Sequence, residues 1–90
     1  MNSYLKYDTN DAGVQVQPTA TILKRIIIAQ KGATSNILKI IDGVDNNGSV
    51  IALLDTTTAV GSIEFDITCN RGLRVQMYNG VAAKVVIVFN

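Results

Sequence analysis

Few side chains in this sequence could carry chemistry, and the densest group lies at residues 42–48. This segment holds two aspartates, two asparagines and two glycines, and carboxylate and amide oxygens are the ligands that calcium prefers. Their spacing does not match an EF-hand loop, however, and Asp, Asn and Gly are also the residues that tight turns require. We therefore predict no metal ligand, although the residues alone leave open whether the loop from Asp42 to Gly48 binds a metal.

Side chains for catalysis are missing elsewhere. Three threonines follow Asp55, but a nucleophilic hydroxyl needs a base beside it, and the chain has no histidine. The single cysteine, Cys69, cannot form an internal disulfide, and we expect it to be a small buried side chain instead of a nucleophile. The sequence therefore predicts no catalytic residue, no cofactor and no enzymatic activity.

A third group of side chains could serve recognition. Arg71, Arg74 and Tyr78 lie close in the sequence, just before an Asn-Gly pair at residues 79–80 that is typical of β-hairpins. Together they could form a small polar and aromatic patch that binds a sugar or another protein. The alternative is that they form the solvated face of a strand.

The elements that must position these groups are strands. Short runs rich in Ile and Val alternate with turns that contain glycine, asparagine or aspartate, which is typical of an all-β sandwich. In residues 62–68 and 73–78 apolar and polar side chains alternate, so one face of each strand should be wet. We expect one small antiparallel β-sandwich, with strands at residues 21–29, 36–41, 50–54, 62–68, 73–78 and 83–89.

The composition limits the partners that this sandwich could bind. Its 90 residues carry eight basic and seven acidic side chains, a net charge of +1, which gives no field to attract nucleic acid or an acidic membrane. Only 17% of the residues are charged, against a typical share of about 25%. We therefore expect a protein partner to cover some of the apolar surface, and we expect the chain to bind neither nucleic acid nor a membrane. The N-terminus lacks an apolar run of signal-peptide length, so synthesis in the cytoplasm is expected.

Three runs break the alternation and indicate where that protein partner would bind. Residues 26–29 and 85–89 are apolar without interruption, and residues 37–41 are apolar except for Lys39. A small sandwich, however, buries only one face of each sheet internally. The outward-facing positions need another cover, from the N-terminal segment, a neighbouring subunit or long loops. We predict that Ile27 and Val86 lie in an interface between subunits.

Residues 1–18 are predicted to form an N-terminal arm, and residues 19–90 the sandwich domain. The arm is polar, has turn formers at residues 8–13, and alternates like a strand only at residues 14–16. Its apolar side chains would anchor it either on the sandwich or on a neighbouring subunit, and Pro18 suits the entry to an edge strand. The predicted interface residues are Tyr4, Leu5, Tyr7, Val14 and Val16 of the arm, together with Ile27, Val86, Arg71, Arg74 and Tyr78.

The order of strands and turns carries a family resemblance. A strand ends in Asp42-Gly43, residues 51–56 read IALLDT, residues 72–75 read GLRV, and residues 83–89 form the terminal run AKVVIVF. This succession resembles small β-sandwich virion proteins of tailed bacteriophages. The resemblance covers about residues 23–90, leaves the arm unmatched, and rests on structural motifs.

This resemblance implies a jelly-roll-like sandwich that decorates the phage capsid. The protein would act as a cement protein, a homotrimer that binds the major capsid protein or other virion proteins on the surface of the head or tail. The family has no catalytic residues to carry over. The competing hypothesis is a module of a head fibre or tail appendage that recognises a receptor or carbohydrate, and it would require an exposed aromatic platform.

Overall fold

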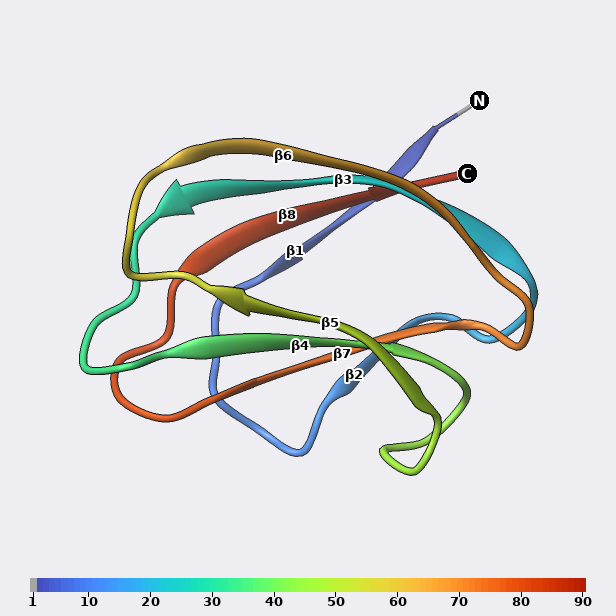
Figure 1. Ribbon diagram of the computed structural model, residues 1–90, viewed down its shortest axis with the longest axis horizontal. Coiled ribbons are helices and arrows are strands. Elements are labelled where there is room, and N and C mark those ends of the chain that lie inside the picture. The colour runs from blue at the N-terminus through green and yellow to red at the C-terminus, as the bar shows by residue number, and fades with distance from the viewer. Residues whose placement is uncertain (1) are drawn as a thin grey trace.

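The computed structural model describes residues 2–90 and contains eight β-strands in two sheets (Figure 1). The strands are β1 (Ser3–Tyr7), β2 (Val14–Gln17), β3 (Thr21–Gln30), β4 (Ile37–Asp42), β5 (Ser49–Asp55), β6 (Gly61–Cys69), β7 (Leu73–Tyr78) and β8 (Lys84–Phe89). No helix among the described residues is long and apolar enough to span a membrane.

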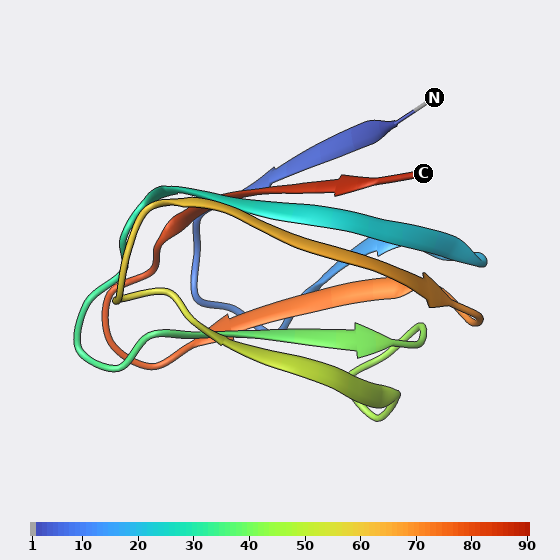
Figure 2. The same cartoon turned by 45° about the horizontal axis from the view of Figure 1, so that its top comes forward.

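The two sheets form an antiparallel sandwich with jelly-roll topology. One sheet has the order β1-β8-β3-β6 and the other β2-β7-β4-β5, and they form two layers (Figure 2). Strands β4 and β5 are the only pair that is adjacent both along the described chain and within a sheet. Every other connection crosses between sheets, as in a jelly roll built from two Greek keys. The predicted all-β, jelly-roll-like sandwich is therefore confirmed.

The core lies between the sheets and follows from the alternation of each strand. On β7, Leu73, Val75 and Met77 are fully buried, while the polar side chains between them are only half-buried. Burying each such aliphatic side chain contributes about 1.5–3 kcal/mol relative to exposing it. The other central strands supply most of the rest of the buried cluster: Leu23, Ile26, Ile28, Leu38, Ile40, Val85 and Ile87.

The segment predicted as an N-terminal arm contributes one strand to each sheet. Strand β1 pairs with the terminal strand β8, from Ser3 opposite Phe89 to Tyr7 opposite Val85. Strand β2 pairs with β7, and a register shift interrupts this ladder between Gln15 and Gln17. The sequence left open whether this segment packs on its own sandwich or on a neighbouring subunit. In the structure it packs on its own sandwich.

Four connections meet at one end of the sandwich, here named the loop end. They are residues 8–13, 31–36, 56–60 and 79–83, which join β1 to β2, β3 to β4, β5 to β6 and β7 to β8 (Figure 1). Backbone hydrogen bonds join the last three of these connections. The amides of Ala33 and Val81 each donate to the carbonyl of the other, at 3.0 and 2.9 Å, and the Gly32 amide donates to the Thr56 carbonyl. The loop end is thus a cross-linked unit.

Candidate functional site

One side of the sandwich leaves its core partly open. Strands β5 and β6 are the edge strands of the two sheets on this side. Apart from Cys69 at the end of β6, their core-facing side chains pack against the buried cluster but are only half-buried, in contrast to the fully buried positions of the central strands. We name this surface the β5–β6 side; it comprises the half-buried Ile51, Ala52, Leu54, Ile63 and Phe65 and the exposed Val50 and Val60, together with Leu53, which is exposed on the outer face of β5 opposite Lys39.

The β5–β6 side continues into a groove at the loop end. The groove has a volume of about 320 Å³ and lies between the end of β5 and the start of β6. Val60 at its rim is 61% exposed, as is Leu53 on β5. The groove is lined mainly by apolar side chains, with the carboxylate of Asp55 at its edge: Ile28, Leu54, Asp55, Thr58, Ala59, Val60, Gly61, Ser62 and Ile63.

The opposite side, between β1 and β2, is closed by Tyr7. Its side chain is only 4% exposed and reaches the other sheet, where its hydroxyl accepts a 3.1 Å hydrogen bond from the Met77 amide. The same hydroxyl donates to a carboxylate oxygen of Asp11 at 2.6 Å. Burial, reinforced by the Asp11 carboxylate, raises the pKa of Tyr7 well above its ordinary value. The core on this side is therefore closed at Tyr7, while Leu5 and Val14 beside it stay half-buried.

Strand β5 also lacks the features that protect an edge strand. Between Ser49 and Asp55 every residue is apolar, without the lysine, proline or inward-pointing charge that usually prevents edge-to-edge pairing. The facing edge strand β6 does carry charges, Glu64 and Asp66, and a register irregularity opposite Leu23–Arg25. An exposed apolar edge is a site for association with another chain. This combination makes the β5–β6 side the candidate functional site.

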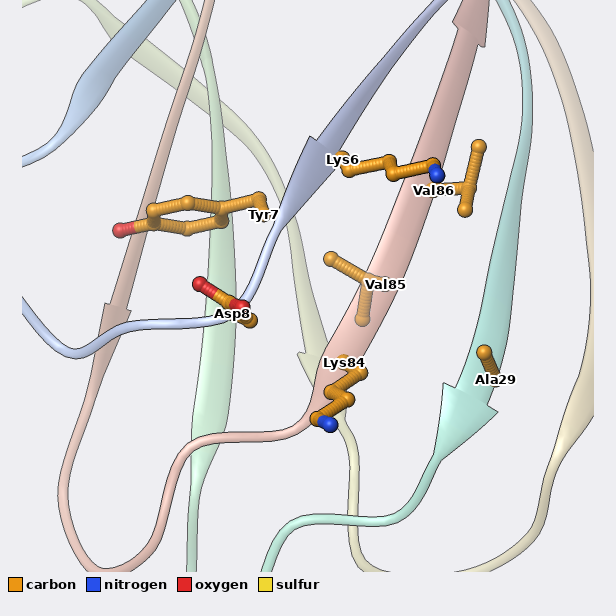
Figure 3. A pocket seen from close by; sticks show the side chains of 7 residues that line it. All are labelled: Lys6, Tyr7, Asp8, Ala29, Lys84, Val85 and Val86. Carbon is orange, nitrogen blue, oxygen red and sulfur yellow. The ribbon is translucent and has the colours of Figure 1, made fainter.

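The outer face of the β1-β8-β3-β6 sheet places Ile27 and Val86 opposite each other. They are partners in the β3–β8 register, and Lys6 is the β1 partner of Val86. A second groove, of about 250 Å³, begins there (Figure 3). In Figure 3 the Lys6 side chain extends across Val86, Lys84 marks the other end of the groove, and the ring of Tyr7 points away from it. The lining residues are Lys6, Tyr7, Asp8, Ala29, Lys84, Val85 and Val86.

The predicted interface residues of the first 18 positions do not share one surface. Tyr4 is 66% exposed on the outer face of β1, whereas Tyr7 and Val16 are buried in the core. Leu5 and Val14 are half-buried and pack against the core. A role in an interface stays a prediction for all five.

Arg71, Arg74 and Tyr78 are not gathered into a compact patch. Arg74 and Tyr78 share one face of β7 with Gln76 between them, while Arg71 is exposed in the turn before β7. The Arg74 guanidinium donates to Asn46 Oδ1 at 2.8 Å and to the Ala12 carbonyl at 3.3 Å. Arg74 thus holds two loops together, and recognition by this group stays a prediction.

The loop from Asp42 to Gly48 uses its oxygens for internal hydrogen bonds. The Asp42 carboxylate accepts from the amides of Arg71 and Asn70, at 2.9 and 3.1 Å, and these bonds lower its pKa. Asp45 accepts from the amide of Asn47, and the Asn46 side chain donates to the Ala12 carbonyl. Within residues 2–90 no three or more His, Cys, Asp or Glu side chains are placed together so that they could hold a metal ion.

Cys69 is fully buried at the end of β6. Burial, and then the negative charge of Asp42, raise the pKa of its thiol, so the nucleophilic thiolate is disfavoured. The expectation of a small buried side chain is confirmed.

Sequence reasoning missed a buried polar pair, Asn36 and Thr56, at the loop end. Both are fully buried. The Asn36 side-chain amide donates to Asn10 Oδ1 and to the Asn79 carbonyl, each at 2.9 Å, and its oxygen accepts from the Thr56 hydroxyl at 2.6 Å. Asn36 therefore ties the four connections of the loop end together. Its only sequence signal was an asparagine directly before an apolar run, which is equally common in ordinary turns.

Comparisons with known proteins identify the fold but not a family. The sequence matches no family model and no curated protein. Among solved structures, the chain is similar to the crystal structure of the Drosophila NLP core, with a TM-score of 0.63 and 11% sequence identity. The match covers 100% of this chain and 97% of the other. That structure is described as providing insight into pentamer formation and histone binding.

This neighbour contradicts the predicted capsid-decoration function. The prediction was a trimeric cement protein of a phage virion that binds capsid proteins and no nucleic acid. The neighbour with the same fold is described in terms of pentamer formation and histone binding, which conflicts with both the trimer and the capsid partner. The prediction rested on strand and turn motifs, which any jelly roll of this size needs and which therefore do not separate one function from another. The predicted virion location is tested by no observation. By its whole-length similarity, this chain has the jelly-roll fold of the NLP core.

Proposed function

We propose that this protein is a non-catalytic subunit that self-associates through its β5–β6 side into a closed ring. The observation that carries the proposal is the partly open core between β5 and β6, where core-facing side chains stay half-buried in the single chain. Exposed apolar surface of this kind, next to an unprotected edge strand, marks a protein-protein interface. A second subunit would complete the burial of Leu54, Ile63 and Phe65.

The proposed ring is a pentamer. Support comes from the Drosophila NLP core, which shares this fold over the whole chain and for which pentamer formation is described. A ring needs one repeated contact between two different surfaces, because a contact between identical surfaces ends at a dimer. The β5–β6 side suits such a head-to-tail arrangement, since its exposed aliphatic side chains Val50, Leu53 and Val60 have no counterpart on β1 and β2.

The test is the mass of the assembly in solution, measured by native mass spectrometry and light scattering. We expect the wild-type chain to have the mass of a pentamer, and Leu53→Lys and Val60→Lys each to reduce it to that of a monomer. The matched control is Val44→Lys in the β4–β5 turn, where the side chain is 59% exposed, close to the 61% of Leu53 and Val60. A monomeric wild-type chain would refute the proposal, and so would a wild-type oligomer that survives both substitutions.

Histone binding by such a ring is a second candidate, favoured by the same neighbour. Its electrostatic support is small, because the chain carries a net charge of +1 and basic histones are attracted by acidic surfaces. Two of the seven carboxylates, Glu64 and Asp66, are already paired with Arg25 and Lys24. Titration of the ring with core histones at low salt would show a complex if this candidate is correct, and its absence would exclude the candidate without affecting self-association.

A further inference from the structure

A ring built on the β5–β6 side needs a second, different surface on the next subunit. The groove in Figure 3 lies on the outer face of the β1-β8-β3-β6 sheet, toward β1. The groove lies over β1, β8 and β3, whereas the β5–β6 side lies along β6, the other edge strand of that sheet, so the two surfaces share no lining residue. Two different patches on each subunit are what a head-to-tail ring requires.

The charges of the two surfaces are complementary. The two ion pairs of residues 2–90 both join β3 to β6, so neither Lys6 nor Lys84 of the groove has an acidic partner within 4.0 Å in the described chain. One carboxylate, Asp8, lines the same groove, which leaves an excess of one positive charge. At the end of β5, Asp55 is exposed and accepts hydrogen bonds from the Thr57 amide and from the hydroxyls of Thr57 and Thr58.

The apolar parts also match. The accessible aliphatic side chains of the groove are the exposed Ala29 and the half-buried Val86, since Val85 is buried in the core. Near Asp55 in the chain, Val60 of the β5–β6 loop and Leu53 on the outer face of β5 are aliphatic and each 61% exposed. A segment that presents aliphatic groups beside one carboxylate is therefore suited to a groove with an aliphatic wall and two lysines at its ends.

We propose that the occupant of the Lys6–Lys84 groove is a second copy of this chain, which inserts the end of β5 and the β5–β6 loop with Asp55 between the two lysines. The inference rests on the proposed self-association and specifies its second surface. It also gives the predicted interface residue Val86 a position in the contact. The interface is heterologous, with the β5 end of each subunit in the groove of the next.

The test combines two variants that block opposite surfaces. We expect Lys6→Glu/Lys84→Glu to be monomeric at concentrations where the wild-type chain is an oligomer, because the groove would then repel Asp55. The control is Lys31→Glu, which reverses an exposed lysine of the β3–β4 connection that lines neither groove, and it should keep the wild-type mass. Mixing the groove variant with Leu53→Lys should restore complexes that contain both chains, since each supplies the surface that the other has lost. Circular dichroism checks that every variant is folded.

Each result separates the two proposals. A wild-type oligomer that persists in Lys6→Glu/Lys84→Glu would overturn the groove assignment and leave self-association standing. Two monomeric variants that never form a mixed complex would also overturn it, because a heterologous contact must be restored by complementation. A monomeric wild-type chain would remove the basis of both proposals.

Discussion

At the scale of single residues, polar side chains decide how the loops of this sandwich are held. Asn36 and Thr56 are buried without an unsatisfied polar atom, and the carboxylates of Asp11, Asp42 and Asp55 all accept bonds from nearby backbone amides. Each of these three carboxyl groups has a lowered pKa. These three carboxylates therefore hold the loops in place through hydrogen bonds.

The Asn36 side chain should be the most sensitive polar site in the chain. Asn36→Ala would remove the 2.9 Å bond to the Asn79 carbonyl and the 2.6 Å bond from the Thr56 hydroxyl. The Asn79 carbonyl would keep only the 3.3 Å bond from Asn10, and the Thr56 hydroxyl only the 3.3 Å bond to the backbone carbonyl of residue 36. We expect a loss of about 1–3 kcal/mol in the free energy of unfolding, because buried polar groups that lose their better hydrogen bonds keep much of their desolvation cost. Denaturant unfolding monitored by circular dichroism measures it.

The control for this substitution is Asn47→Ala in the exposed β4–β5 turn. A surface asparagine of this kind should change stability by no more than about 0.5 kcal/mol. Equal effects at the two positions would mean that Asn36 does not connect the loops in the way its hydrogen bonds indicate.

At the scale of elements, the connections between strands were harder to predict than the strands. The Asn-Gly pair indicated a hairpin, and both residues do adopt left-handed backbone conformations, with φ of 66° at Asn79 and 59° at Gly80. Yet β7 and β8 belong to different sheets and do not pair. The hairpin prediction is therefore wrong. The turn after β7 pairs instead with the β3–β4 connection, through the bridge between Ala33 and Val81.

Gly80 tests this view of the turn. A Cβ added at Gly80 would collide with the carbonyls of Ala33 and Thr34, in a backbone conformation that L-residues rarely adopt. We expect Gly80→Ala to lower the free energy of unfolding by more than about 1 kcal/mol, since both strain and clash oppose it. Gly61 is the matched control: its φ is +132°, but a Cβ there would have nothing within 4 Å. If Gly80→Ala costs no more than Gly61→Ala in denaturant unfolding, the turn is not packed against residues 33–34.

Local patterns predicted six strands well and missed two. The predicted runs from residue 21 onward agree with β3 to β8 to within a residue or two at each end, because each combines β-branched residues with turn signals. Strands β1 and β2 are short and polar, and only their long-range partners β8 and β7 make them strands. The predicted interface residue Ile27 was correctly expected to face outward, because the run Ile26–Ile28 alternates between core and surface despite its uniform composition.

The candidate site could not be predicted in the same way. Leu54, Ile63 and Phe65 have the sequence pattern of ordinary core residues, and nothing near them in the chain indicates that they stay half-buried. Their exposure arises because β5 and β6 are both edge strands on the same side, which depends on the order of all eight strands. Edge position is a property of the topology, whereas alternation is a property of the local sequence.

At the scale of the whole molecule, the open β5–β6 side links stability to assembly. If the ring supplies part of the core of each subunit, unfolding and dissociation are coupled, and stability depends on protein concentration. For a pentamer that unfolds as it dissociates, a tenfold rise in concentration stabilises each subunit by about 1 kcal/mol. In a domain of this size that corresponds to an increase in melting temperature of about 4–8 °C.

We therefore expect the melting temperature of the wild-type chain to rise with each tenfold increase in concentration, measured by calorimetry. The monomeric Leu53→Lys variant should melt at a temperature that does not depend on concentration, and below that of the concentrated wild-type chain. An oligomeric wild-type chain with a constant melting temperature would show that each sandwich is stable before it assembles. In that case the half-buried side chains of β5 and β6 would add affinity between subunits without adding to the stability of the fold.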